Sequence, residues 1–149
     1  MRRWNGWGDD ATAMALNSGA CAMLRERLGP GHPGQDAERK KLLRQVPPTR
    51  LTRHRLIRSD ADTRLSMALG ESYGDWIRKR FGDVPPVPDG VAFPKSRDEV
   101  RTLLDLAQRN DWVVIPFAGG TSVAGHLDCP VSERPILSLN LGRLSGLLA

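Results

Sequence analysis

The stretch VAFPKSRDEVRTLLDLAQRNDWVVIPFAGGTSVAG, residues 91–125, decides the fold of this chain. Its first three residues form a candidate strand. A helix over residues 96–110 is predicted by apolar side chains at helical spacing, which begin behind the Ser-x-x-Glu capping box of Ser96 and Glu99. The dense apolar run at residues 112–115 indicates a buried strand. Strand, helix and strand in this order predict a βαβ unit, and hence a parallel pair joined by a right-handed crossover.

A glycine-rich loop follows the second of these strands directly. Gly119 and Gly120 can adopt positive φ and leave the backbone bare. Consecutive N–H groups in such a turn form a concavity that binds anions, and Thr121 and Ser122 add hydroxyl donors. The loop therefore predicts a phosphate or pyrophosphate site. An ordinary turn is the alternative, because neither a GxGxxG fingerprint nor a Walker loop is present.

The composition excludes several classes of protein. Of 149 residues, 40% are hydrophobic and 26% charged, which is typical of globular proteins and excludes fibrous and fully disordered ones. The longest apolar run is too short for a membrane helix, and the polar, acidic start does not fit a signal peptide. The two cysteines and three histidines lack the spacing of metal ligands. We expect a soluble, cytoplasmic protein without a disulfide framework or a metal.

The net charge of +5 is concentrated in residues 35–64, which hold nine basic and four acidic side chains. A basic cluster of this kind can bind nucleic acid or an anionic membrane surface. No aromatic side chains interleave with it and no recognition helix is predicted, so nucleic-acid binding is the weaker hypothesis. We expect a solvated face whose cations pair with acids elsewhere, and peripheral membrane contact is a further alternative.

The first 90 residues predict smaller elements. The pentapeptide WNGWG at residues 4–8 carries two tryptophans, which we expect to pack on the folded body. Alternating apolar residues on either side of an Asn-Ser-Gly turn favour a small hairpin over residues 11–24, with a helix as the alternative. Residues 37–45 can be helical. Residues 60–81 predict a helix whose apolar stripe includes Tyr73 as a core residue.

Three segments together resemble a known group of flavoproteins: WNGWG at residues 4–8, VPDGVAFPKSRDEV at residues 87–100 and PFAGGTSVAG at residues 116–125. They are similar to alkyldihydroxyacetonephosphate synthases and related FAD-linked oxidases, which share a vanillyl-alcohol-oxidase-type FAD-binding domain. The resemblance implies an α+β fold in three parts. These are an amino-terminal extension with a basic linker (residues 1–58), a helical segment with a Pro-rich connection (residues 59–90) and the first, incomplete half of the FAD-binding domain (residues 91–149).

The resemblance also implies FAD as the cofactor, bound at its pyrophosphate by the loop of residues 116–122. Ala118 stands where the family has the first glycine of a triplet, and its methyl group would crowd the pyrophosphate if the position needed positive φ. His126 matches no position of covalent flavin attachment. The implied FAD-contacting residues are Pro116, Phe117, Ala118, Gly119, Gly120, Thr121 and Ser122.

No catalytic residue is assigned, because the family supplies its catalytic tyrosine and histidine residues from a later substrate domain. The complete protein is expected to be an FAD-linked oxidoreductase or an ether-lipid synthase that acts on a lipid-like substrate. Its partners would be FAD and the carboxy-terminal part of the same flavoprotein. We expect the chain alone to be inactive, and to bind FAD weakly or not at all, since only one of several FAD-contacting loops is present.

Overall fold

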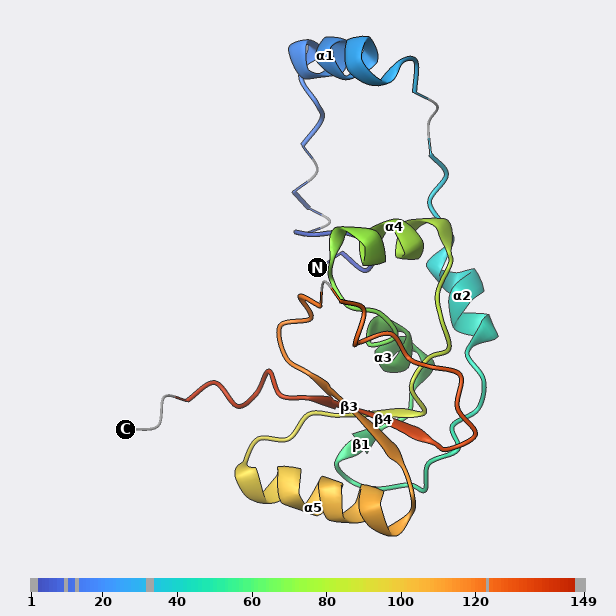
Figure 1. Ribbon diagram of the computed structural model, residues 1–149, viewed down its shortest axis with the longest axis vertical. Coiled ribbons are helices and arrows are strands. Elements are labelled where there is room, and N and C mark those ends of the chain that lie inside the picture. Colours follow the sequence, from blue (N-terminus) through green and yellow to red (C-terminus); the bar gives the residue numbers. More distant parts are fainter. Residues whose placement is uncertain (1–2, 10, 13, 32–33, 123, 147–149) are drawn as a thin grey trace.

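A computed structural model describes residues 3–9, 11–12, 14–31, 34–122 and 124–146 of the chain. Helices and strands alternate irregularly along it (Figure 1), which confirms the predicted α+β class. The elements are α1 (Ser18–Leu28), α2 (Arg39–Gln45), β1 (Ile57–Arg58), α3 (Ala61–Ser66), α4 (Tyr73–Phe81), β2 (Gly90–Ala92), α5 (Arg97–Arg109), β3 (Val113–Phe117) and β4 (Ile136–Asn140). None of the described helices is long and apolar enough to cross a membrane.

The four strands form one sheet in the order β1-β2-β4-β3. β2 and β3 both run parallel to β4, whereas β1 is antiparallel to β2. The strand-helix-strand unit is therefore present, but β2 and β3 do not pair with each other as predicted. β4 lies between them because four of its five residues are buried, and a strand buried on both faces belongs at the centre of a sheet.

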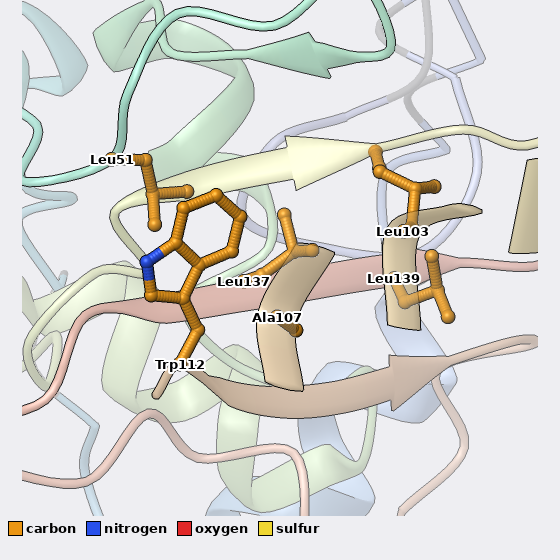
Figure 2. Close-up of a cluster of buried hydrophobic side chains, with 7 residues drawn as sticks. Leu51, Leu103, Ala107, Trp112, Leu137 and Leu139 are labelled. Carbon is orange, nitrogen blue, oxygen red and sulfur yellow. The ribbon is translucent and has the colours of Figure 1, made fainter. Parts of the chain in front are cut away.

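The main hydrophobic core lies between α5 and the sheet. Leu103 and Ala107 of α5 meet Leu137 and Leu139 of β4, and the indole ring of Trp112 lies beside them (Figure 2). Ser96 begins α5 as predicted, since its side chain accepts a hydrogen bond from the Glu99 N–H at 3.2 Å. The predicted capping box is incomplete, because the Glu99 carboxylate accepts from the Lys95 N–H at 2.7 Å and not from Ser96. α2, α3 and α4 lie on the other side of the sheet from α5 (Figure 1).

A buried carboxylate, that of Asp89, connects the start of β2 to the start of β4. Asp89 accepts bonds from Arg50 Nε at 2.8 Å and Nη2 at 2.7 Å, and from the Ile136 N–H at 2.8 Å. Burial by itself would raise the pKa of Asp89, but the hydrogen bonds from Arg50 and from the backbone outweigh it, so this pKa lies below its usual value. Asp89 is therefore ionised and forms part of the sheet's support.

Residues 60–81 form two helices instead of the single one predicted. Asp60 caps α3, and Ser72 with Asp75 forms a capping box that begins α4. Gly70 lies between the two helices, where a Cβ would stand only 2.9 Å from the Gly120 carbonyl oxygen. Because α4 begins anew at Tyr73, its residues do not continue the helical spacing of α3, and the apolar side chains of the two helices do not form one stripe. Trp76 remains buried, but Tyr73 is 70% exposed and is not the core residue that was expected.

Residues 18–28 form helix α1, so the predicted hairpin is wrong and the helical alternative is confirmed. The Asn17 side chain accepts a hydrogen bond from the Ala20 N–H at 2.8 Å, which makes the Asn-Ser-Gly sequence a helix start instead of a hairpin turn. Gly29 ends the helix with φ 78°. One residue of the predicted hairpin, Ala13, lies outside the described part of the chain.

The basic stretch pairs with acids, but of the three pairs that follow, one reaches an acid elsewhere in the chain, as expected, and two lie within the stretch itself. Arg39 pairs with Asp62, Arg50 with Asp89, and Arg58 with Asp60. Arg64 is buried and donates to the carbonyl oxygens of Pro88 and Pro47, both at 2.7 Å. Arg50 and Arg64 therefore connect segments that are distant in the sequence, whereas the Arg58–Asp60 pair is local.

Candidate functional site

The loop of residues 116–122 begins at the carboxyl end of β3. Pro116 and Phe117 are the last residues of that strand, and the other five follow it. In sheets with parallel strands, ligands bind outside the carboxyl ends of the strands. Phe117 and Ser122 are buried and fix the two ends of the loop, while Ala118, Gly119 and Thr121 are exposed. The loop is thus placed where a parallel sheet offers a binding site.

The two adjacent glycines, Gly119 and Gly120, differ in backbone conformation and in the space around them. Gly120 has φ 75°, and a Cβ there would stand 3.0 Å from both the Glu71 Cγ and the Phe117 Cζ. Gly119 has no positive φ, and a Cβ there would find no atom within 4 Å. Gly120 is therefore required by the fold, whereas Gly119 leaves open space beside the backbone.

Ala118 fits the loop without strain. Among the described residues, Asp111 is the one non-glycine residue with positive φ, so the Ala118 backbone lies in a region that alanine adopts readily. The exchange of glycine for alanine at this position therefore leaves the loop conformation intact.

Four consecutive residues of the loop have backbone N–H groups without a partner in the described part of the protein; Gly119 and Thr121 are exposed, whereas Gly120 and Ser122 are buried. In the part of the chain that the structure describes, the N–H groups of Gly119, Gly120, Thr121 and Ser122 donate no hydrogen bond to protein. A series of consecutive unpaired N–H groups is the donor set that a phosphate or pyrophosphate takes from a backbone turn. The residues present therefore fit the phosphate end of a nucleotide.

The loop rests on the segment between α3 and α4. The Glu71 N–H donates to the Gly120 carbonyl at 2.6 Å, and the Glu71 carbonyl accepts a hydrogen bond from the Trp7 indole N–H at 3.1 Å. The Trp7 ring lies 6.4 Å from the Tyr73 ring and 6.5 Å from the Trp76 ring, centroid to centroid. The expected packing of WNGWG on the body is thus confirmed, and it reaches the glycine loop through one residue, Glu71.

Sequence reasoning did not identify Glu71. The only signal near it is the Ser-x-x-Asp pattern of Ser72 and Asp75, which marks the start of α4 and indicates a connection just before it. A contact of this kind depends on tertiary packing and has no local sequence pattern.

The loop continues into a segment that is held against α4. Ser122 Oγ lies 2.7 Å from His126 Nδ1, and Arg78 Nη1 donates to Asp128 Oδ2. The hydrogen bond to Asp128 raises the pKa of Arg78 above its usual value. Cys129 is buried, and its N–H donates to the Ala68 carbonyl at 3.4 Å. Within the described residues, no group of three or more His, Cys, Asp or Glu side chains could hold a metal ion.

Comparison with known proteins shows which family and which proteins the chain is similar to. Residues 88–149 match the FAD binding domain family. The chain is 36% identical over 94 residues to the alkyldihydroxyacetonephosphate synthase of Trypanosoma brucei brucei. It is 33% identical over 92 residues to that of Dictyostelium discoideum. Each match covers 62% of this chain but 15% of the relative, so the chain spans a small part of the length of these curated proteins.

Solved structures share the fold. Two structures of alkyldihydroxyacetonephosphate synthase superpose on 99% of this chain, with TM-scores of 0.70 and 0.69 and identities of 23% and 22%. The chain covers 34% of each of them. The predicted likeness to these flavoproteins is confirmed, and the family match identifies FAD as the cofactor. Residues 88–149 match the FAD binding domain family, and the chain resembles the alkyldihydroxyacetonephosphate synthases in sequence and fold.

Proposed function

We propose that the loop of residues 116–122 binds the pyrophosphate of FAD. The observation that carries this proposal is the row of four unpaired N–H groups from Gly119 to Ser122, at the carboxyl end of β3 and inside the FAD binding domain match. The loop contains no cationic side chain. Backbone dipoles therefore supply the attraction for the phosphate charge.

Each part of the loop has a separate task in this proposal. Gly119 has open space where a side chain would stand, so a phosphate oxygen can approach the backbone closely. Gly120 sets the turn through its positive φ and its bond to Glu71. Thr121 is exposed and adds a hydroxyl donor. When bound, FAD supplies hydride or electron transfer, and the residues described here hold its phosphate end.

We further propose that the chain is the amino-terminal FAD-binding portion of an FAD-linked oxidoreductase or of an alkylglycerone-phosphate synthase-like enzyme. The names of the relatives support the second reading. The part of those relatives that this chain does not cover would carry the substrate groups that separate the two reactions.

The loop proposal is tested by titrating the ¹⁵N-labelled chain with FAD into the millimolar range and following its amide resonances. The N–H signals of residues 119–122 are expected to shift most, because they bond directly to the phosphates. Shifts confined to other parts of the chain would contradict the proposal.

A matched pair of glycine variants makes the test sharper. A Cβ at either Gly119 or Gly34 meets no atom within 4 Å, and neither residue has positive φ, so both alanine variants should fold as the unaltered chain does. Gly119→Ala should weaken FAD binding about tenfold, the loss of one charge-assisted hydrogen bond, whereas Gly34→Ala should leave it unchanged. Equal affinity of the two variants would show that the loop does not approach the phosphates.

A further inference from the structure

We propose that His126 is a positioning residue of this site. Its ring prepares the Ser122 hydroxyl to donate to a phosphate oxygen, and FAD consequently binds more tightly when His126 is protonated. This inference rests on the proposed function of the 116–122 loop and adds to it a residue and a pH dependence.

Ser122 is held in one place by its surroundings. Its side chain is buried, with 5% exposed, and lies close to Gly70, where an added Cβ would stand 3.5 Å from the Ser122 Cβ. Its Oγ lies 2.7 Å from His126 Nδ1, and within the described chain this is the one hydrogen bond of the hydroxyl. His126 itself is exposed. The ring can therefore exchange protons with solvent while it contacts a buried donor of the loop.

The direction of this hydrogen bond decides what Ser122 offers to an anion. A serine hydroxyl has a single hydrogen. If Nδ1 lacks a proton, Ser122 donates that hydrogen to the ring and presents only lone pairs to the loop. If Nδ1 carries a proton, the ring donates to Oγ, and the Ser122 hydrogen is free to donate to a phosphate oxygen.

Protonation of His126 fixes the second arrangement. The imidazolium form carries a proton on both nitrogens, whereas the neutral ring carries one on either. A phosphate that accepts from Ser122 therefore favours the protonated ring, and the protonated ring favours the phosphate, since coupling between two binding events is reciprocal. The positive charge of the ring acts in the same direction.

Charged side chains on the neighbouring segments have partners of their own, although Asp128 Oδ1 is buried without a hydrogen bond in the described part of the chain. Asp128 is held by Arg78 of α4, and Asp75 accepts bonds from the Ser72 N–H at 2.9 Å and from the Ser72 hydroxyl at 2.8 Å. Lys79 donates to the Gly70 carbonyl at 3.1 Å, and Glu71 belongs to the segment that supports Gly120. Of the side chains named here, His126 is the one whose ring nitrogen lies within hydrogen-bond distance of the Ser122 hydroxyl.

The test is the affinity for FAD between pH 5.5 and 8, measured by titration of the chain and its variants. The unaltered chain should bind FAD about tenfold more tightly at the lower pH, the effect of one charge-assisted hydrogen bond. His126→Gln supplies an amide N–H that can donate to Ser122 at every pH, so its affinity should remain high and lose the pH dependence. His126→Ala should bind weakly at every pH, and Ser122→Ala should abolish the dependence with His126 still present.

Two results would overturn the inference: a pH profile of His126→Gln that equals that of the unaltered chain, or an affinity of His126→Ala that equals it at low pH. Because His126 is exposed, thermal unfolding of its variants should match the unaltered chain and serves as the folding control. If Gly119→Ala weakens FAD binding while the His126 variants behave as the unaltered chain does, the loop function stands and the positioning role is wrong. If FAD shifts resonances elsewhere in the unaltered chain and leaves those of residues 119–122 unchanged, both are wrong.

Discussion

Helix α1 differs from the rest of the fold, the body formed by the elements from α2 to β4, in how much tertiary packing supports it. α1 is well defined locally, with Asn17 at its start and Gly29 at its end, yet none of its eleven residues is buried. It stands apart from the other elements at the end of two extended connections (Figure 1). In β4, by contrast, four of five residues are buried, and the buried Asp89 bonds to the backbone at its first residue.

This difference shows that a helix can be well defined by its local sequence without being stabilised by packing. Capping is enough to place a helix start, but an isolated helix of this length is marginal in water without tertiary packing. The FAD binding domain match begins at residue 88 and so includes β2, α5, β3 and β4 of the packed region. The candidate site belongs to that region as well, because its loop leaves β3 and rests on the segment before α4.

The two cysteines provide the sharpest contrast between these regions. Cys21 lies on α1 and is partly exposed, whereas Cys129 is 2% exposed in the body. Burial and the neighbouring Asp89 carboxylate raise the pKa of the Cys129 thiol to about 12. Since the thiolate is the reactive form, a shift from 9.0 to about 12 slows Cys129 about a thousandfold at neutral pH.

A thiol-reactive disulfide reagent at pH 8 should therefore modify one cysteine quickly in the native chain and two in urea. Cys21→Ser is the control, and it should leave the native chain without a fast thiol. Two thiols that react at equal rates in the native chain would mean that the body opens as readily as α1 does.

Two leucines allow the same comparison for packing. Leu103 of α5 is fully buried between the helix and the sheet, and Leu28 of α1 is 79% exposed. Leu103→Ala should lower the free energy of unfolding by about 2–5 kcal/mol, the usual cost of a cavity. Leu28→Ala should change it by less than about 0.5 kcal/mol. Urea unfolding measures both, and a large effect at Leu28 would show that α1 is packed on something in solution.

The lowered pKa of Asp89 makes the free energy of unfolding depend on pH. Its pKa is lowered in the folded chain, so its contribution is fully present above the unfolded value near 4 and is lost as the pH falls through the folded value. Asp89→Asn should cost about 2–3 kcal/mol at pH 7, because it leaves Arg50 without its charge partner. The variant should also lose less stability than the unaltered chain between pH 5 and 2.

Asp105→Asn is the matched control for this change, because Asp105 is exposed on α5. It should alter the free energy of unfolding by less than about 0.5 kcal/mol. If Asp89→Asn had the same small effect, Asp89 would not support the sheet and β4 would be held by apolar packing alone.

The sequence predicts the elements of the body because their signals are local. The β-branched run at residues 112–115 and the Ser96 cap lie inside the elements that they mark, and both predictions agree with β3 and α5. The order of strands is not local, so the insertion of β4 between β2 and β3 was missed. The break at Gly70 was also missed, because its cause is the approach of Gly120 from a distant part of the chain.

The same distinction applies to the candidate site. A Gly-Gly-Thr-Ser sequence directly after a strand predicts where a turn begins, but the prediction that this turn binds a pyrophosphate depends on the resemblance to flavoproteins. The division of tasks between Gly119 and Gly120 could not be predicted, because it depends on contacts with Glu71 and Phe117. Nor could the pairing of Ser122 with His126, which lies in a loop without helical periodicity.

Gly119 and Gly120 are adjacent in the loop, and their alanine variants are expected to differ in stability. Gly120→Ala should lower the free energy of unfolding by about 1–2 kcal/mol, because alanine is disfavoured at positive φ. Its methyl group would also stand 3.0 Å from atoms of Glu71 and Phe117. Gly119→Ala should leave stability unchanged and affect only FAD binding. If instead Gly119→Ala destabilised the fold while Gly120→Ala did not, the roles of the two glycines would be reversed. The side of the loop that is open to a phosphate would then be the side that packs against Glu71 in this structure.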